Sequence, residues 1–250
     1  MTGPLGATLL AFDTSTERLA VALSWPSGER FADEPGGAAA SAALLPAAQR
    51  LLGEAGLAWR DLDAIAFGQG PGAFTGLRTS CAVAQGLGVA LVRPLLAIDS
   101  LLIVAEDARR QADQAQDVFD IDVVMDARMG EVYGGRYRWT LGRWSVLHAA
   151  ELLSPQDLAE CWRRAPPLAI AGSALLAAIE GPWSDLGPAV QEWPNEQSRA
   201  RALLALARSA WADGSRVDAA DALPTYLRNK VALTTAEREA VRLAKATHPA

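Results

Sequence analysis

Two aspartates, Asp13 and Asp126, each end an apolar run, and nearly half the chain separates them. Carboxylates in such positions could face a phosphate group or hold a metal ion. Phosphate binding would also need glycine-bearing turns, so that backbone N–H groups can approach the anion. The turns at residues 14–16 and 127–130 carry no glycine in the needed place. We therefore expect both carboxylates to accept hydrogen bonds from N–H groups of their own turns. At most, the two positions are remnants of a phosphate-binding site.

A glycine-rich stretch, GQGPGAFTG at residues 68–76, could be a nucleotide-binding loop. A Walker-type loop ends in Gly-Lys-Ser/Thr and brings a lysine to the outer phosphates, but no lysine occurs before Lys230. We expect a strand-to-helix turn in which Gly68, Gly70 and Gly72 adopt unusual dihedral angles and Pro71 stiffens the bend. Weak anion binding at the helix N-terminus, with Arg78 one turn in, stays open. The residues of this structural loop or weak anion site are Gly70, Pro71, Gly72, Phe74, Thr75 and Gly76.

Other catalytic chemistry finds little support in the residue types. The chain has two histidines, His148 and His248, and no ligand spacing typical of zinc or iron. No Gly-x-Ser-x-Gly motif is present for a serine hydrolase, and Cys81 and Cys161 form no Cys-x-x-Cys pair. We therefore expect no metal site, no cofactor and no hydrolytic triad.

Charge and hydropathy limit the partners. The net charge of −6 disfavours a large nucleic-acid footprint, because phosphate binding relies on clustered Lys and Arg. The longest weakly polar run, residues 81–92, is interrupted by Gln85 and is too short to span a bilayer. The first ten residues carry no charged side chain before a brief apolar stretch and do not resemble a secretory signal. We expect a cytoplasmic, globular protein with no membrane association.

Strands alternating with helices must position these residues. The apolar runs 8–15 and 18–25 predict a hairpin, and residues 62–68 and 93–100 predict further strands. Apolar residues at helical spacing predict a helix within 38–56 and another over 75–92. Ser100 is expected to cap a helix that begins at Leu101. In the second half we expect helices over 154–164 and 198–213, with a strand over 167–173 between them.

The opening pattern recurs in the second half of the chain. IDVVMDARMGEVYGGRYRW at residues 121–139 repeats the order apolar run, aspartate, turn and apolar run of residues 8–25, and it aligns Asp126 with Asp13. This indicates a duplicated α/β fold. We expect an N-terminal lobe over residues 1–105, a C-terminal lobe over 106–232 whose helix 198–213 packs back on the first lobe, and a charged tail over 233–250.

Three stretches together resemble a known bacterial family: LLAFDTSTERLAVAL, GQGPGAFTGLRTSCAVAQGLG and VVMDARMGEVYGGRY. With PTYLRNKVA near the end, the chain resembles the TsaB (YeaZ) family over roughly residues 8–232, most specifically in residues 70–78. The resemblance implies the duplicated fold of actin, sugar kinases and heat-shock-70 (the ribonuclease H-like fold). It also implies a role in making threonylcarbamoyladenosine in tRNA as a non-catalytic partner of the paralogue TsaD, which carries the metal-binding histidines and transfers the threonylcarbamoyl group.

The resemblance further implies how such a chain would work. The predicted helices 38–56 and 75–92 would pack against the equivalent pair in TsaD as a heterodimer, with TsaE as the ATPase partner in a ternary complex. The chain would contact tRNA only indirectly and would form a homodimer when isolated. The expected interface residues, assigned to the two helices by periodicity, are Leu44, Leu45, Ala48, Leu51, Leu52, Leu77, Arg78, Cys81, Ala84 and Gln85.

Two alternatives belong to other functional classes. An ATP-dependent phosphotransferase of the same fold would use Asp13 and Asp126, although the missing glycines and lysine disfavour it. A glycoprotease-like peptidase would need metal ligands or a catalytic triad that the residue pattern does not supply. The four-residue spacing of Gly76, Ser80, Ala84 and Gly88 instead favours close helix packing, either within the core or against a partner.

Overall fold

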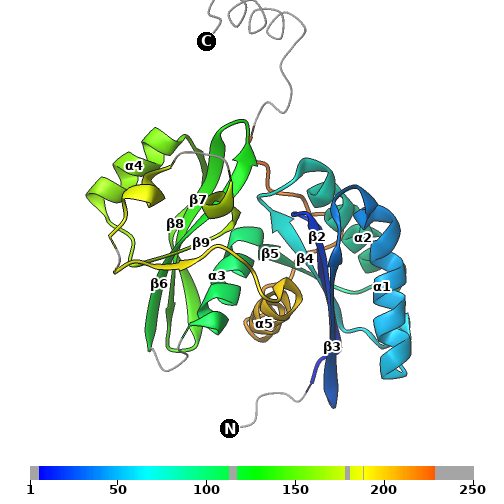
Figure 1. Ribbon diagram of the computed structural model, residues 1–250. Coiled ribbons are helices and arrows are strands. Elements are labelled where there is room, and N and C mark those ends of the chain that lie inside the picture. The colour runs from blue at the N-terminus through cyan, green and yellow to red at the C-terminus, as the bar shows by residue number, and fades with distance from the viewer. Residues whose placement is uncertain (1–5, 113–116, 178–180, 188, 229–250) are drawn as a thin grey trace, which may run out of the picture.

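Two five-stranded mixed sheets stand side by side in the computed structural model, which describes residues 6–112, 117–177, 181–187 and 189–228 (Figure 1). The first sheet has the order β3-β2-β1-β4-β5 and the second the order β8-β7-β6-β9-β10. In the order given, the first three strands of each sheet are antiparallel to their neighbours, and the last two run parallel to the third. The strands are β1 (Leu9–Asp13), β2 (Arg18–Trp25), β3 (Gly28–Pro35), β4 (Ala64–Gly70), β5 (Leu95–Asp99), β6 (Val118–Arg128), β7 (Glu131–Thr140), β8 (Arg143–Leu153), β9 (Ala169–Ala171) and β10 (Gln191–Trp193).

Helices cover both faces of the first sheet, which explains its continuous apolar strands. Leu10 and Phe12 of β1 face α1 (Ala40–Ala55) and α2 (Phe74–Leu91), which form the outer layer. Leu9 and Ala11 face the opposite way, toward α5 (Arg199–Ala212). Both predicted outer helices are present. Gly56 ends α1 with a φ of 69°, a conformation that glycine adopts at little cost.

The helix that follows each sheet crosses to the other sheet. α3 (Ser100–Gln111) comes after β5 but packs with Val104 and Ala108 against Val123 and Tyr137 of the second sheet. α5 comes after β10 but packs on the first sheet, and it also contacts α3. The two helices therefore lie between the sheets (Figure 1). Because α3 crosses residue 105, the predicted boundary between the lobes falls inside a helix.

The second lobe repeats the first with a reduced outer layer. α4 (Pro155–Arg164), capped by Ser154, packs with Leu158 and Trp162 on the outer face of the second sheet. Two short 3-10 helices, η3 (Ser173–Leu176) and η4 (Pro182–Asp185), stand between β9 and β10, where the first lobe has α2. The remaining 3-10 helices are η1 (Gly37–Ala39) and η2 (Trp59–Asp61). The shared strand order and crossed helices confirm the predicted duplicated, two-lobed α/β fold of the actin type.

The predicted cap of α3 was wrong. Asp99, not Ser100, precedes the helix, and its Oδ1 accepts hydrogen bonds from the N–H groups of Leu101 at 2.8 Å and Leu102 at 3.4 Å. Ser100 is already the first helical residue, and its Oγ accepts a hydrogen bond from Gly70 N–H at 3.1 Å. Asp and Ser are both favourable N-cap residues. Asp99 is the cap because the helix begins one residue earlier than predicted, directly after β5.

Candidate functional site

A cleft of about 750 Å³ opens between the two lobes. The turn after β1 and the turn after β6 line it from opposite sides, together with the N-terminus of α2 and the segment 225–228. Asp126 lies in its wall, whereas Asp13 is completely buried beneath it. The two aspartates that the repeat relates therefore flank the same region, but only one of them reaches the cleft.

The Asp13 carboxylate accepts five hydrogen bonds from donors within the chain. Its Oδ1 accepts a hydrogen bond from Ser15 N–H, which is the turn contact expected from the sequence. Its Oδ2 accepts from Ser15 Oγ at 3.0 Å and, at the long distance of 3.4 Å, from Ser100 Oγ. The same oxygen accepts from Arg199 Nε at 3.1 Å and Nη2 at 2.8 Å. Four of the five donors therefore converge on Oδ2, and the carboxylate is completely buried, so it is not presented to the cleft.

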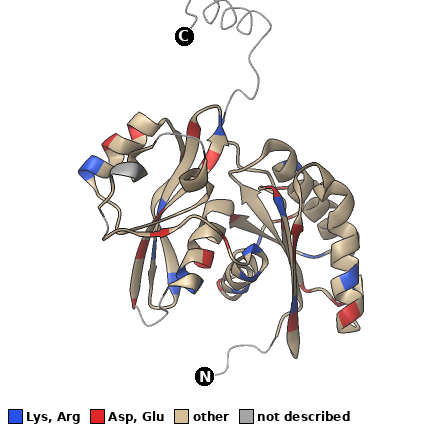
Figure 2. Ribbon diagram, viewed as in Figure 1, with Lys and Arg blue, Asp and Glu red and all other residues tan. Residues whose placement is uncertain are grey.

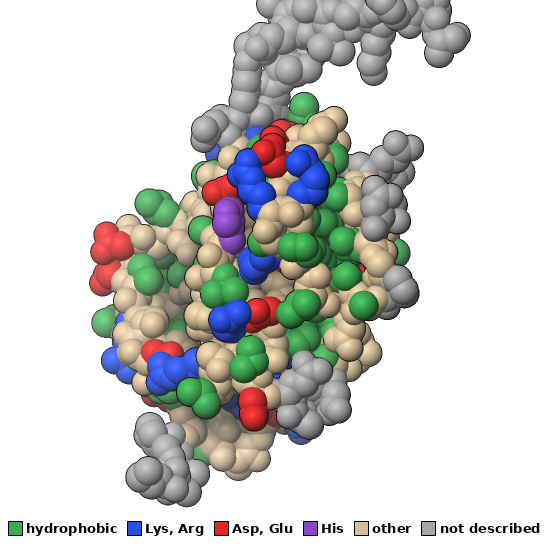
Figure 3. Space-filling view, turned by 90° about the vertical axis from the view of Figure 1, so that its left-hand side faces the viewer, with side chains coloured by type: hydrophobic (Ala, Val, Ile, Leu, Met, Phe, Trp, Pro, Cys, Tyr) green, Lys and Arg blue, Asp and Glu red, His purple; other side chains and the backbone are tan. Residues whose placement is uncertain are grey.

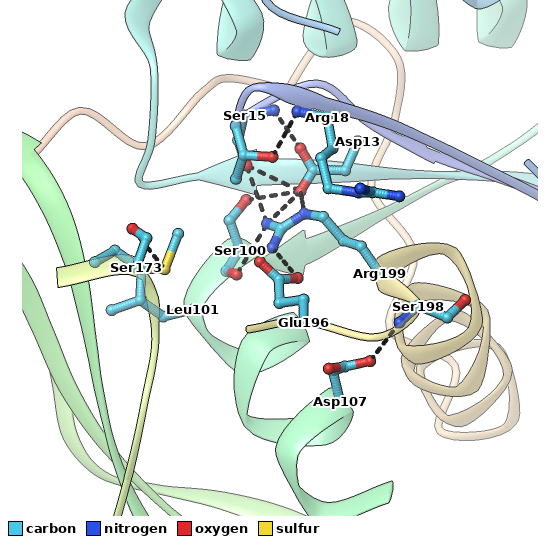
Figure 4. A network of polar contacts seen from close by, with 12 residues as sticks. Asp13, Ser15, Arg18, Ser100, Leu101, Asp107, Ser173, Glu196, Ser198 and Arg199 are labelled. Carbon is cyan, nitrogen blue, oxygen red and sulfur yellow. Dashed lines mark hydrogen bonds and ion pairs between the residues drawn. The ribbon is translucent and has the colours of Figure 1, made fainter. Parts of the chain in front are cut away.

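Arg199 is the functional residue that the sequence did not reveal. Its side chain is 1% exposed and forms an ion pair with Asp13 at 2.8 Å and with Glu196 at 2.7 Å (Figure 4). Nη2 also donates to Ser15 Oγ at 3.1 Å and to the Ser100 carbonyl oxygen at 3.2 Å. Burial lowers the pKa of the guanidinium, but Asp13 and Glu196 raise it further, so its pKa lies above the ordinary value and the group stays charged.

One local signal did mark Arg199. It is the first residue of α5, immediately after the Ser198 cap, and a positive charge at a helix N-terminus opposes the helix dipole. Such a placement needs a nearby negative charge. The sequence could not show which carboxylate supplies it, since Asp13 lies 186 residues away.

Asp126 is also engaged by an arginine. Its Oδ1 accepts a hydrogen bond from Arg128 N–H at 2.7 Å, and its Oδ2 lies 3.3 Å from Arg128 Nη1. Arg128 Nη2 then reaches Glu17 of the opposite turn at 3.2 Å. The two turns that would have to receive a phosphate group between them are thus joined by an ion pair across the cleft.

The glycines of the loop make room for the turn after β1. A Cβ atom at Gly68 would lie 2.4 Å from Asp13 Cγ, and one at Gly76 only 1.8 Å from the Thr14 carbonyl oxygen. A Cβ at Gly72 would lie 2.6 Å from the Ser15 carbonyl oxygen. The expected unusual dihedral angle is found at Gly70 alone, with a φ of 114°. For Gly68 and Gly72 that explanation was wrong: the Asp13 carboxyl group leaves no room for a side chain at Gly68, and the Ser15 carbonyl oxygen and Cβ leave none at Gly72.

Two glycines within α2 allow a matched test. Gly76→Ala should lower the free energy of unfolding by about 3 kcal/mol, because its Cβ overlaps a backbone oxygen that cannot move away. Gly86→Ala in the same helix meets nothing within 4 Å, so it should leave stability unchanged or raise it by up to about 1 kcal/mol. Urea unfolding of both variants measures the difference. Equal stabilities would contradict the close approach of the turn to α2.

Arg78 and Phe74 of the loop region contact the C-terminal segment. The Arg78 guanidinium lies 3.8 Å from the Phe74 ring centroid, and its Nε donates to Tyr226 Oη at 3.0 Å. The ring centroids of Phe74 and Tyr226 are 5.3 Å apart. Arg78 therefore serves the protein's own packing, and weak anion binding beside exposed Thr75 stays a prediction.

The residues expected at the partner interface divide by burial. Leu45 is 43% exposed, Arg78 is exposed and Gln85 is half-buried. The others pack inside their own lobe, so they are reassigned from the interface to the core: Leu44, Ala48, Leu51, Leu52, Leu77, Cys81 and Ala84. Periodicity found the apolar stripe of each helix, but the sheet covers that stripe. Whether the two helices form an interface stays a prediction.

Cys81 and Gln85 hold the chain's own C-terminal segment. Cys81 Sγ donates to the Ala222 carbonyl oxygen at 3.3 Å, and Gln85 Nε2 donates to the same oxygen at 2.9 Å. Burial raises the pKa of the Cys81 thiol above its ordinary value, which keeps it in the unreactive protonated form. These side chains attach Ala222 to α2.

The solvent side of α1 and α2 forms a surface with little charge. We define this outer helical face by Ser41, Ala42, Leu45, Gln49, Ala82, Gly86 and Val89. Val89 is 68% exposed. Figure 2 shows charged residues on α1 only toward its C-terminal end. The other side of the molecule differs, because Figure 3 shows side chains of both charges spread among hydrophobic ones over the second lobe.

The described residues offer no alternative centre for catalysis by metal. No group of three or more His, Cys, Asp and Glu side chains among them could hold a metal ion. His148 is exposed on β8, with Nδ1 3.1 Å from the Ala149 carbonyl oxygen, and His248 lies outside the described residues, as does the predicted tail 233–250. Within the same part of the chain, no helix has both the length and the apolar character to cross a membrane.

Comparison with known proteins agrees with this architecture. Residues 34–171 match the family model described as TsaD, tRNA N6-adenosine threonylcarbamoyltransferase. The Escherichia coli tRNA threonylcarbamoyladenosine biosynthesis protein TsaB is 30% identical over 240 residues, covering 90% of this chain and 96% of that protein. The Haemophilus influenzae TsaB is also 30% identical, covering 90% and 94%. YeaZ from Pseudomonas aeruginosa is similar in structure, with a TM-score of 0.74, 38% identity and coverage of 88% of this chain and 100% of that one.

The family-model match shows a TsaD-related protein, and the repeated sheet and crossed helices give it the two-lobed α/β architecture of the actin type. Within that class, the chain belongs to the TsaB (YeaZ) family of tRNA threonylcarbamoyladenosine biosynthesis proteins.

Proposed function

We propose that this chain is a non-catalytic scaffold or activator subunit of threonylcarbamoyl transfer to adenosine 37 of tRNA. It works by forming a heterodimer with TsaD, and TsaE joins the pair as the ATPase partner. The observation that carries the proposal is the buried Asp13–Arg199 ion pair. In this pair the Asp13 carboxylate, on which chemistry in the cleft would depend, is bound by a side chain of the same chain.

The outer helical face supports a role in protein contact. Small side chains such as Ala42, Ala82 and Gly86 let a second helix approach closely, and exposed Leu45 and Val89 supply apolar area. A related pair of helices on TsaD would complete a helical bundle with this face. In the absence of TsaD, a second copy of the chain would cover the same apolar area as a homodimer. RNA contact then falls to the partner and the chain stays cytoplasmic.

The alternatives fit the site less well. A phosphotransferase would need Asp13 free to orient a metal ion or phosphate, but Arg199 already neutralises that carboxylate. A peptidase of the serine or cysteine type would need a nucleophile polarised by a histidine. The one histidine among the described residues, His148, is exposed on β8, and its hydrogen-bond partner is the Ala149 carbonyl oxygen, which is not a nucleophile.

The docking surface can be tested with paired charges. Leu45→Glu combined with Ala82→Glu should weaken the heterodimer with TsaD at least tenfold in Kd, a loss of about 1.4 kcal/mol or more, because unpaired carboxylates would be buried in an apolar interface. Both positions are exposed, so the lobe should stay folded. Calorimetric titration with purified TsaD measures the affinity, and a tRNA modification assay reports its consequence.

The control is Leu168→Glu, a change of the same kind at a side chain that is 72% exposed in the second lobe. It should leave TsaD affinity unchanged. Charges at Ala48 and Ala84 would not serve, because both side chains are buried and their replacement would unfold the first lobe. Normal affinity of the Leu45 and Ala82 double variant would remove this face as the interface.

Nucleotide turnover separates the scaffold from the phosphotransferase. The isolated chain should hydrolyse ATP no faster than buffer, and Asp13→Asn should show the same background rate, because Asp13 is sequestered by Arg199. A coupled phosphate-release assay measures both. Turnover by the purified chain that Asp13→Asn abolishes would support the phosphotransferase instead.

A further inference from the structure

The start of α5 is the place where the two lobes are tied together by buried charge. Arg199 contacts Asp13 and Ser15 at the end of β1, in the first lobe. It also donates to the carbonyl oxygen of Ser100, the first residue of α3, and α3 packs on the second sheet. The Arg199 guanidinium therefore joins the end of β1 in the first lobe to α3, the helix that packs on the second sheet (Figure 4).

Two further carboxylates, Asp107, which is buried, and Asp33, which is half-buried, fix the residues on either side. Asp107 of α3 accepts hydrogen bonds from the N–H groups of Gln197 and Ser198, both at 2.9 Å. Asp33 of β3 accepts from Ser198 Oγ at 2.7 Å and from Ala200 N–H at 3.0 Å. The segment between β10 and α5 is thus attached to the first sheet by one carboxylate and to α3 by the other.

The Glu17–Arg128 pair at the mouth of the cleft is much weaker. Glu17 and Arg128 also bridge the lobes, at 3.2 Å, but both side chains are largely exposed to solvent. An exposed ion pair contributes little because water and salt screen it. Removal of one partner from a buried, hydrogen-bonded pair is costly, since the other charge is left without compensation. The buried pair at the start of α5 therefore contributes more to the arrangement of the lobes than the Glu17–Arg128 pair does.

We propose that Arg199 is a built-in cation that locks the two lobes in one relative orientation without any ligand in the cleft. All three nitrogens of its guanidinium have partners on the chain: Nε on Asp13, Nη1 on Glu196, and Nη2 on Asp13, Ser15 and Ser100. The lock keeps the outer helical face in a constant position relative to the second lobe. It concerns this chain alone, so it stands or falls independently of the partner proposed above.

The test measures the distance between the lobes. Spin labels at Arg60→Cys in the first lobe, outside the outer helical face, and at Leu168→Cys in the second lobe are placed in a chain with Cys81→Ala and Cys161→Ser. Diluted with excess unlabelled chain, so that only distances within one copy are measured, this chain should give one narrow distance distribution by pulsed electron resonance. Adding Asp13→Asn and Arg199→Met removes both charges of the completely buried pair; Glu196 also loses its partner, but its side chain is 17% exposed and water can reach it. This double change should broaden or shift that distribution. A folded double variant with an unchanged narrow distribution would overturn the lock.

The matched control removes an ion pair that stays within one lobe. Arg136 and Asp122 form a partly buried pair at 2.8 Å between β6 and β7. Asp122→Asn with Arg136→Met should lower the melting temperature but keep the narrow distance distribution, because both strands belong to the second sheet. If this control broadened the distribution as much as loss of Arg199, general destabilisation would explain the effect and the lock would be rejected.

Chemical rescue provides a second readout. Arg199→Ala leaves a cavity bordered by the oxygens of Asp13, Glu196 and Ser100. Millimolar methylguanidinium should enter it, raise the melting temperature of this variant and narrow the distance distribution, whereas sodium chloride of equal ionic strength should do neither. A folded Arg199→Ala chain that gains nothing from methylguanidinium would count against the lock, and if the variant does not fold, the double variant decides.

Discussion

The buried ion pair between Asp13 and Arg199 is the constraint on which the arrangement of the molecule depends. Both side chains are removed from water, and either one alone would be an uncompensated charge costing about 3–5 kcal/mol. The turn after β1 and the first residue of α5 must therefore meet. That requirement places α5 on the first sheet, although the chain reaches it from the second, and it brings α3 against α5.

The same pair explains the glycine-rich loop. Asp13 must face inward to reach Arg199, so the turn at residues 13–15 lies flat against the loop and the first turn of α2. Thr14 Oγ1 donates to the Gly76 carbonyl oxygen at 2.7 Å, and Ala73 N–H donates to the Ser15 carbonyl oxygen at 2.7 Å. A motif that resembles a phosphate cradle is thus filled by the chain's own backbone. It fixes the direction of α2 and hence the outer helical face.

Much of the fold was predictable because its signals are local. Continuous apolar runs marked β1 and β2, helical spacing marked α1 and α2, and the repeat around Asp126 indicated the duplication. The edge strands β3 and β8 were missed, because each has a mixed sequence with few buried residues, and so it shows neither an apolar run nor strict alternation. The burial of adjacent residues could not be told apart either: Leu44 is buried and Leu45 is exposed. The two side chains are about 100° apart around a helix that is apolar over much of its circumference, so periodicity does not separate them.

The site was less predictable than the fold for a physical reason. A catalytic cleft and an inactivated one share the same carboxylates, strands and turns, and they differ in what pairs with each carboxylate. For Asp13 that partner comes from a distant part of the chain, because Arg199 lies 186 residues away, whereas Asp126 pairs with Arg128 of its own turn. Both carboxylates are paired within the chain, which is the basis of the non-catalytic role proposed above. That role depends on surface, and the loop and the ion pair fix the position of the outer helical face that would supply it.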